Sequence, residues 1–265
     1  METLEHRRFA EFCDACRRYG YIGLCYGSPG VGKTLSAKSY SRWGKVQERG
    51  RWSAGPVEGP ALDTIFYTPS VVNAPMGIKA DITRARATLT DLAKRPLLCE
   101  KKEKLKDIQR RDDEHYAEML YQHDWLTKPI PELHPTYGDM AMAYAEKEQQ
   151  IKDPTTLILV DEADRLRLAS LEQVRAIFDA GEIGVILIGM PGLEKRLARY
   201  PQFYSRIGFV HEFRPLAVAE IHQLLEQRWT PAGVHLPEQT WDSETAAAVI
   251  RITGGNFRLL NRLLT

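Results

Sequence analysis

Eight consecutive residues of this sequence match the pattern G-x-x-x-x-G-K-[ST] in full. In chain order they are Gly27, Ser28, Pro29, Gly30, Val31, Gly32, Lys33 and Thr34. Glycines in such a loop let the backbone turn so that its N–H groups point inward around phosphate oxygens. The Lys33 ammonium can then reach the β- and γ-phosphates, and the Thr34 hydroxyl can ligate Mg²⁺. The pattern therefore predicts a loop that binds the phosphates of a nucleoside triphosphate.

A pair of carboxylates follows a mostly apolar, strand-forming run at 156–160. Asp161 and Glu162 end this run, as expected where a buried parallel strand delivers acids to its carboxyl edge. Asp161 is placed to hold Mg²⁺, directly or through water, and Glu162 can polarise a water for attack on the γ-phosphate. The alternative is an acidic pair that only meets solvent. The acidic pair occurs in the same chain as a complete phosphate loop, and this combination favours the catalytic interpretation.

The surrounding sequence predicts an alternation of strands and helices. An apolar run at 21–26 precedes the phosphate loop and a helix at 34–43 follows it, so the helix N-terminus faces the anion. The alternative to a phosphate-binding loop is a plain glycine turn, which would not require a strand before it and a helix after it. Further strands are predicted at 63–68, 156–160, 184–189 and 207–213, and further helices at 2–18, 170–180 and 193–200. Such alternation is typical of an α/β fold.

Composition limits the class of protein. Hydrophobic residues make up 43% of the 265 residues, enough for a buried core, and the net charge is only +1. No stretch approaches the roughly 20 apolar residues of a membrane span, and residues 1–18 are too charged for a signal peptide. We therefore expect a cytoplasmic protein with no membrane partner. The four cysteines predict no disulfide framework, and Cys13 and Cys16 are expected to pack as small apolar residues.

The segment from about residue 79 to 152 is expected to be a helical insert. We predict helices at 81–94, 97–122 and 137–151, a proline-containing connector at 127–135, and a loop before the insert at 49–62. From 79 to 111, eleven basic residues stand against five acidic ones. This excess is typical of a surface that faces a polyanion, and a solvated helical face is the alternative.

The last part of the chain, 215–265, contains three helical stretches at 217–229, 243–253 and 257–264. They form a small helical appendage after the last predicted strand. The sequence stops inside the last of these helices, so we expect the natural chain to continue beyond Thr265.

The order of these parts resembles an AAA+ ATPase over nearly the whole chain apart from the insert. It is similar to one branch in particular, the transposition regulators of the MuB, TnsC and TniB type. The resemblance rests on the runs 160–166 and 187–193, on Arg196 and Leu197, on the triplet 205–207, and on Pro215 with Leu216. It implies an α/β AAA+ P-loop core at 1–214 with a five-stranded parallel sheet, and a small helical lid at 215–265. ATP and Mg²⁺ would bind between core and lid.

The resemblance also implies roles for single residues. Arg206, just before the last core strand, looks like the arginine finger that reaches the nucleotide of a neighbouring subunit, and Arg199 is the reserve candidate. Arg258 is similar to the lid arginine that senses the γ-phosphate. Met190 departs from the family pattern, because many members have a polar residue there that contacts the attacking water. Hydrolysis is therefore expected to be slow or to depend on a partner.

The branch implies an ATP-dependent homo-oligomer, a ring or a helical filament, that binds double-stranded DNA through its phosphates and contacts a transposase to select target DNA. The candidate DNA contacts are Lys79, Arg84, Arg86, Lys94 and Arg95. A rival from another class is a signalling or defence NTPase that switches a protein–protein interface without DNA. A small-molecule P-loop kinase is a further alternative, and Glu162 directly after Asp161 counts against it.

Overall fold

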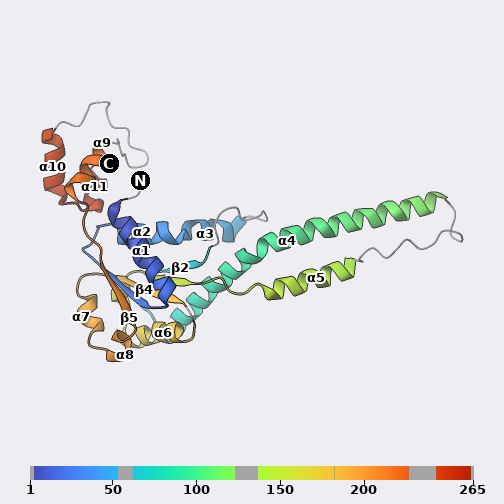
Figure 1. Cartoon of the computed structure of the whole chain (residues 1–265), viewed down its shortest axis with the longest axis horizontal. Helices are drawn as coiled ribbons and strands as arrows, with labels where there is room; N and C mark the ends of the chain where they lie inside the picture. The colour runs from blue at the N-terminus through green and yellow to red at the C-terminus, as the bar shows by residue number, and fades with distance from the viewer. Residues whose placement is uncertain (1–2, 53–61, 123–136, 182, 227–242, 264–265) are drawn as a thin grey trace. The chain divides into compact units, whose positions relative to one another are not determined.

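The structure of this chain is a computed structural model that describes residues 3–52, 62–122, 137–181, 183–226 and 243–263. The chain divides into two compact units, and Figure 1 labels the elements of both. The first unit comprises residues 1–44, 63–85 and 155–265, and the second comprises 45–62 and 86–154. Within the described ranges, no helix is both long and apolar enough to cross a membrane.

A five-stranded parallel sheet forms the centre of the first unit. Its strands are β1 (Ile22–Tyr26), β2 (Thr64–Tyr67), β3 (Leu157–Val160), β4 (Gly184–Gly189) and β5 (Ile207–Glu212), in the order β2-β3-β4-β1-β5. Every residue of β3 and β4 is buried, as expected for apolar strands covered on both faces. The predicted α/β fold with a five-stranded parallel sheet is confirmed.

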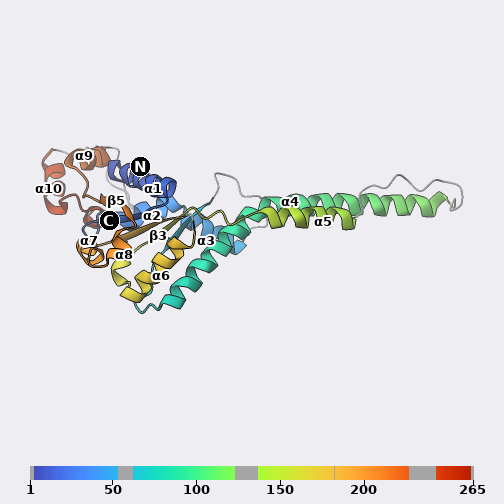
Figure 2. The same ribbon diagram turned by 60° about the horizontal axis from the view of Figure 1, so that its bottom comes forward.

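Helices cover both faces of this sheet (Figures 1 and 2). On one side lie α1 (Leu4–Tyr19) and α2 (Lys33–Ser41), and on the other lie α6 (Leu168–Asp179), α7 (Leu193–Leu197) and α8 (Pro201–Tyr204). The Thr3 hydroxyl caps the start of α1 by accepting a hydrogen bond from the His6 amide, and Gly20 ends the helix with a φ of 61°.

The apolar stripe of α1 packs against one face of the sheet. Phe9, Phe12, Cys13 and Cys16 belong to a buried cluster that also contains Cys25 of β1. The C-x-x-C pair is therefore part of the core. Burial raises the pKa of the Cys16 thiol to about 12. Among the described residues, no group of three or more His, Cys, Asp or Glu side chains is arranged to hold a metal ion.

The helices α9 (Val218–Glu226), α10 (Ser243–Thr253) and α11 (Phe257–Leu263) also belong to the first unit but form an apolar cluster of their own. Its buried members are Leu216, Ile221, Leu224, Leu225, Ala246, Val249 and Leu260. The chain turns between α10 and α11 at Gly255, which has a φ of 78°. A Cβ at this position would lie 2.3 Å from the Leu216 carbonyl oxygen, so the turn requires glycine.

Two long helices make up most of the described part of the second unit: α4 (Pro75–Gln122), which begins in the first unit, and α5 (Tyr137–Gln150). Two contacts join them: Lys94 Nζ to Glu148 Oε1 at 3.2 Å, and the Tyr144 hydroxyl to Glu100 Oε1 at 2.8 Å. A third joins α4 to the residues just after α5, from Arg86 Nε to Asp153 Oδ2 at 2.5 Å. Because the partner's number falls as the α4 position rises, α5 runs antiparallel to α4.

Three predictions about helix ends are wrong. The expected break between 94 and 97 is absent, since α4 is continuous through Pro96. An interior proline costs a helix about 3 kcal/mol, which many good helix formers on both sides can offset in a helix this long. The predicted loop at 49–62 is helical as far as Trp52, the end of α3 (Trp43–Trp52), and the predicted helix 193–200 ends at Leu197. Residues 53–61 and the predicted connector 127–135 lie outside the described residues.

The packing of α1 on β1 can be tested at Gly23. A Cβ there would lie 2.4 Å from Cys16 Sγ and 2.7 Å from Phe12 Cζ. We expect Gly23→Ala to lower the free energy of unfolding by about 1–3 kcal/mol, because the core has no room for another methyl group. At Gly77 in α4 a Cβ would meet nothing within 4 Å, so Gly77→Ala should be neutral or stabilising by up to about 1 kcal/mol. Equal urea midpoints for the two variants would contradict this packing.

Candidate functional site

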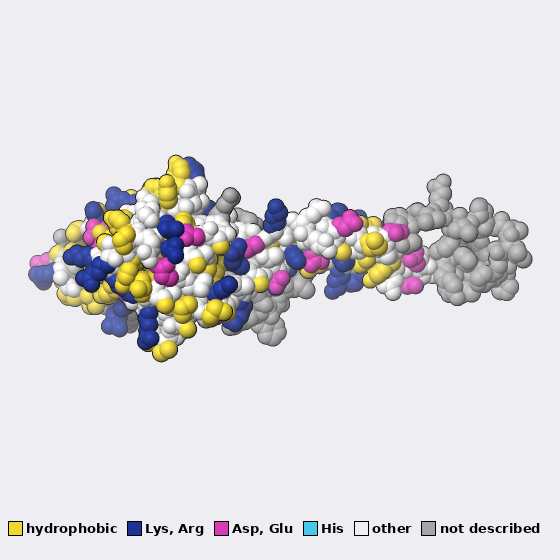
Figure 3. All heavy atoms as spheres, turned by 90° about the horizontal axis from the view of Figure 1, so that it is seen from below, with side chains coloured by type: hydrophobic (Ala, Val, Ile, Leu, Met, Phe, Trp, Pro, Cys, Tyr) yellow, Lys and Arg dark blue, Asp and Glu magenta, His cyan; other side chains and the backbone are white. Residues whose placement is uncertain are grey.

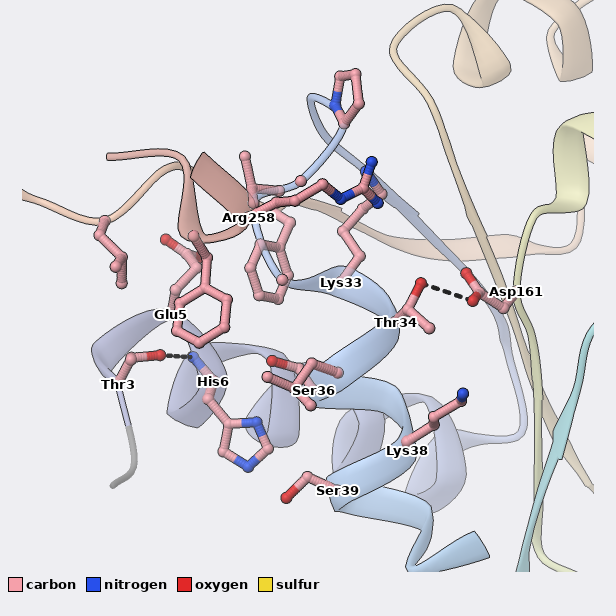
Figure 4. A pocket seen from close by; sticks show the side chains of 18 of the residues that line it. Thr3, Glu5, His6, Lys33, Thr34, Ser36, Lys38, Ser39, Asp161 and Arg258 are labelled. Carbon is pink, nitrogen blue, oxygen red and sulfur yellow. Dashed lines mark hydrogen bonds between the residues drawn. The ribbon is translucent and has the colours of Figure 1, made fainter. Parts of the chain in front are cut away.

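A cavity of about 1260 Å³ in the first unit is lined by the glycine-rich loop, by α2 and by the turn after β3. Gly189 and Met190 after β4, and Phe257, Arg258 and Asn261 of α11, complete its walls. The first turn of α1 lines it as well, and Figure 4 shows side chains from these elements converging. The cavity is large enough for a nucleoside triphosphate.

The loop before α2 needs glycine at three positions. Gly30 and Gly32 have φ values of 81° and 112°, in the left-handed region that other residues rarely adopt. At Gly27 a Cβ would lie 2.3 Å from the Phe213 carbonyl oxygen. The loop therefore turns tightly into the N-terminus of α2, whose free N–H groups are suited to bind an anion.

Lys33 is the first residue of α2, and its side chain folds back across the loop. Its Nζ donates hydrogen bonds to the carbonyl oxygens of Gly27, at 2.5 Å, and of Ser28, at 2.8 Å. Burial lowers the pKa of the Lys33 ammonium, and this effect outweighs the opposing influence of nearby acidic groups such as Asp161. The predicted phosphate-binding lysine thus lies within the curve of its own loop.

A hydrogen bond joins the two predicted magnesium ligands. The Thr34 hydroxyl lies 2.7 Å from Asp161 Oδ2, and Figure 4 shows this contact across the cavity. The amide of Glu162 donates to the other Asp161 oxygen at 3.0 Å. Asp161 is 3% exposed, so this carboxylate is oriented by partners on both oxygens. One hydroxyl and one carboxylate at this position are oxygen ligands of the kind that Mg²⁺ prefers.

The turn after β3 also positions Arg165 and Asp164, two charged residues to which the motif analysis gave no role. The Glu162 carboxylate forms an ion pair with Arg165 in the short helix η1 (Ala163–Arg165), and Glu162 itself has a φ of 50°. Asp164 accepts a hydrogen bond from the Met190 amide at 2.8 Å. The spacing of three residues between Glu162 and Arg165 is the only sequence signal for the ion pair.

Met190 lines the cavity and is 39% exposed. It follows β4 directly, at the position where many members of the resembled family have a polar side chain. The Asp164 carboxylate, which accepts a hydrogen bond from the Met190 amide, also lines the cavity. A Cβ at Gly189 would lie 2.6 Å from Asp164 Oδ2, so glycine at the end of β4 leaves room for this carboxylate.

The start of α11 and the residue before it contact the glycine-rich loop directly. The Arg258 amide donates to the Gly30 carbonyl at 2.9 Å, and Asn256 Nδ2 donates to the Pro29 carbonyl at 2.8 Å. Figure 4 shows the Arg258 side chain extending over Lys33. Asn256, which the sequence analysis did not name, therefore joins the start of α11 to the loop.

Neither of the two candidates for the arginine finger, Arg206 and Arg199, lies in this cavity. Arg206 makes a double contact with Asp179, Nε to Oδ1 at 2.6 Å and Nη2 to Oδ2 at 3.0 Å. This contact raises the pKa of the Arg206 guanidinium. Arg199 is exposed, and neither arginine is among the residues that line the cavity.

The five candidate DNA contacts all lie on α4, but they belong to both compact units. Arg84 pairs with Asp81 at 3.2 Å, and Arg86 and Lys94 make the ion pairs to Asp153 and Glu148 given above. Lys79 is exposed and Arg95 is half-buried. On the face drawn in Figure 3, basic and acidic side chains are interspersed. Three of the five candidates thus have an acidic partner within the chain.

Comparison with known proteins agrees with this geometry. A family model described as an AAA domain matches residues 16–197. A "potential ATP-binding protein" of Staphylococcus aureus is 38% identical over 272 residues, which cover 99% of this chain and 85% of that protein. The Mu-like prophage FluMu DNA transposition protein B of Haemophilus influenzae is 27% identical over 120 residues, or 43% of this chain and 40% of that protein.

Among solved structures, that of the Aeropyrum pernix ORC1 protein in complex with DNA matches with a TM-score of 0.46 and 16% identity, over 98% of this chain and 57% of that one. The phosphate loop, the acidic pair and the parallel sheet define a P-loop nucleotide-binding protein. The chain belongs to the AAA domain family, whose model covers most of the first unit's sheet and the cavity's loop.

The role of Lys33 gives a direct test of the cavity. We expect Lys33→Ala to weaken ATP binding by about 10- to 100-fold, because a charge-assisted hydrogen bond contributes about 1.5–3 kcal/mol. Isothermal titration with a non-hydrolysable ATP analogue measures the change in Kd. Lys45→Ala, at an exposed lysine of α3, is the matched control and should bind as the wild type does. If both variants bound the ATP analogue with equal affinity, its phosphates would have to bind away from Lys33.

Proposed function

We propose that this chain binds ATP with Mg²⁺ in the cavity and hydrolyses it to ADP and phosphate. The observation that carries the proposal is the Thr34–Asp161 hydrogen bond, which joins the phosphate loop to the carboxylate after β3. Thr34 and Asp161 would hold the metal ion, which neutralises charge on the phosphates. Lys33 and the backbone N–H groups of the 27–34 loop, apart from Pro29, bind the phosphates, and Arg258 approaches them from the lid.

In the chemical step, Glu162 accepts a proton from a water molecule as that water attacks the γ-phosphorus. The bond from the γ-phosphorus to the bridging oxygen breaks, and that oxygen leaves as part of ADP. Lys33 and Arg258 offset the negative charge that the transferring group carries. Arg206 would contribute to the site of a neighbouring subunit, and for this its contact with Asp179 must open.

We further propose that the ATPase is a homo-oligomer that binds double-stranded DNA and regulates transposition with a transposase. The similarity to a DNA transposition protein B over 43% of the chain supports this role. Residues 1–214 would form the core and 215–265 the lid, with the helical insert at about 79–152 carrying the DNA contacts. Lys79 is the best placed of the candidate contacts because it is exposed and, unlike the exposed Arg84, is not in an ion pair identified among the described residues.

A second function is a nucleotide-switched signalling or defence NTPase that acts through protein–protein contacts without DNA. The ion pairs of Arg84, Arg86 and Lys94 favour it, because a basic residue that already has an acidic partner gains less from a phosphate. A measurement of DNA binding distinguishes the two proposed functions, because only the transposition regulator requires it.

Glu162 can be tested by the isosteric change Glu162→Gln. We expect kcat for ATP hydrolysis to fall by about 10²–10⁴-fold, because the amide cannot accept the proton, while ATP still binds. The trapped nucleotide should also stabilise any ATP-dependent assembly, which sedimentation would detect. Glu48→Gln, at an exposed glutamate of α3, is the control and should keep the wild-type rate. A Glu162→Gln variant that hydrolyses ATP normally would exclude Glu162 as the base.

DNA binding should depend strongly on salt if it uses phosphate contacts. We expect the log of the affinity for duplex DNA, measured with ATP and Mg²⁺, to fall linearly with the log of salt concentration, with a slope of about −0.9 per contact. Lys79→Ala should reduce the magnitude of this slope by about 0.9, the value for one phosphate contact. Lys195→Ala, at an exposed lysine of α7, should leave the slope unchanged. An affinity that is independent of salt, or no binding, would favour the switch over the DNA-binding role.

A further inference from the structure

The short helix η1 brings one more carboxylate, that of Asp164, to the wall of the cavity. Glu162, with its φ of 50°, turns the chain out of β3, and η1 follows at once. Because β3 and β4 are neighbouring parallel strands, the turn after β3 lies beside the end of β4. Asp164 is exposed and lines the cavity together with Lys33 and Glu162. The hydrolysis step proposed above gives this carboxylate no role.

Contacts with two other elements orient Asp164. Its Oδ2 accepts a hydrogen bond from the Met190 amide at 2.8 Å. The Arg196 guanidinium of α7 donates to the backbone carbonyl of Asp164 at 2.9 Å and also to that of Leu166. A Cβ at Gly189 would lie 2.6 Å from Asp164 Oδ2 and 3.1 Å from its Cγ, so glycine is required beside this side chain. The main chain and one oxygen of Asp164 are therefore fixed by the protein itself.

The second carboxylate oxygen of Asp164, Oδ1, is an available acceptor. Within the described part of the chain, no group donates a hydrogen bond to it. The charge of Asp164 also acts on the Lys33 ammonium, since Asp164 is one of the acidic groups that oppose the lowering of the Lys33 pKa by burial. This lysine in turn offsets part of the repulsion between the carboxylate and a phosphate. Oδ1 can therefore serve at the phosphate end of the cavity.

A water that attacks the γ-phosphorus has two O–H groups that need acceptors. In the proposed step Glu162 accepts the proton of one, and an acceptor for the other would direct the oxygen lone pair toward phosphorus. Met190 offers only a thioether sulfur, which is a weak acceptor. Asp164, which contacts the Met190 amide, offers an ionised oxygen, and hydrogen bonds to such oxygens are the stronger ones.

We propose that Asp164 is a second catalytic carboxylate, whose Oδ1 accepts a hydrogen bond from the attacking water and directs its lone pair toward the γ-phosphorus. This inference rests on the proposed ATPase function. Asp164 takes no proton in the step. One proton of the water passes to Glu162, the other remains on the oxygen that becomes part of the product phosphate, and the bond to the ADP oxygen breaks. The reaction therefore needs the oxygen of Asp164 and not only its size.

The first test is steady-state ATP hydrolysis by the full chain with Asp164→Asn. This change keeps the size of the side chain and one oxygen for the Met190 amide, but it turns an NH₂ group toward the water. We expect kcat to fall about 10- to 100-fold, with KM for ATP unchanged or lower and the urea midpoint unchanged. Asp91→Asn, at an exposed aspartate of α4 that does not line the cavity, is the matched control and should keep the wild-type kcat.

A second pair of variants separates orientation of the water from support of the turn. Asp164→Ala removes both oxygens and should be at least as slow as Asp164→Asn. Adding Met190→Asn to Asp164→Ala supplies an amide oxygen at the neighbouring position and should raise kcat about fivefold or more above Asp164→Ala alone. A side chain that only supported the turn would not be replaced in this way.

Two outcomes overturn this inference and leave the proposed ATPase in place, provided that the wild type hydrolyses ATP. One is a wild-type kcat in Asp164→Asn, and the other is a double variant no faster than Asp164→Ala. A wild type that binds ATP and does not hydrolyse it overturns the proposed ATPase activity and this inference with it.

Discussion

The hydrogen bond between Thr34 and Asp161 joins two segments that follow non-adjacent strands. Thr34 comes after β1 and Asp161 after β3, and β4 lies between these strands. The contact is possible because all five strands are parallel, so that their carboxyl ends share one edge. Reversing or shifting one of these strands would separate the hydroxyl from the carboxylate. The geometry of the candidate site therefore depends on the buried apolar strands more than on the loop itself.

Glycine in the 27–34 loop also allows the start of α11 to pack closely against it. A Cβ at Gly30 would lie 2.5 Å from Asn256 Oδ1 and 3.0 Å from Arg258 Cβ, so only glycine lets the first turn of α11 approach. This close contact brings Arg258 and Lys33 to the same end of the cavity. Two cations together favour a highly charged anion, and burial of Lys33 adds to the benefit of phosphate contact.

Two basic residues of α4 pair with acidic residues of their own unit. Arg86 and Lys94 hold the α5 side of the hairpin through Asp153 and Glu148. An excess of basic residues in sequence is thus partly neutralised by acidic residues that follow more than fifty positions later. A count of charges over one stretch of sequence therefore overestimates the positive charge available to a polyanion wherever such long-range ion pairs form.

The sequence by itself determined the phosphate loop, the strand before it, the acidic pair and the alternation of strands and helices, because each depends on local spacing and on apolar runs. It did not determine the path of α4 through Pro96, since tertiary and helical context overrides the local preference of one proline. Only the tertiary structure decided that Arg165 faces Glu162, that Asn256 contacts the loop, and that Arg206 pairs with Asp179. Those contacts join residues whose proximity depends on how strands and turns meet at one edge of the sheet.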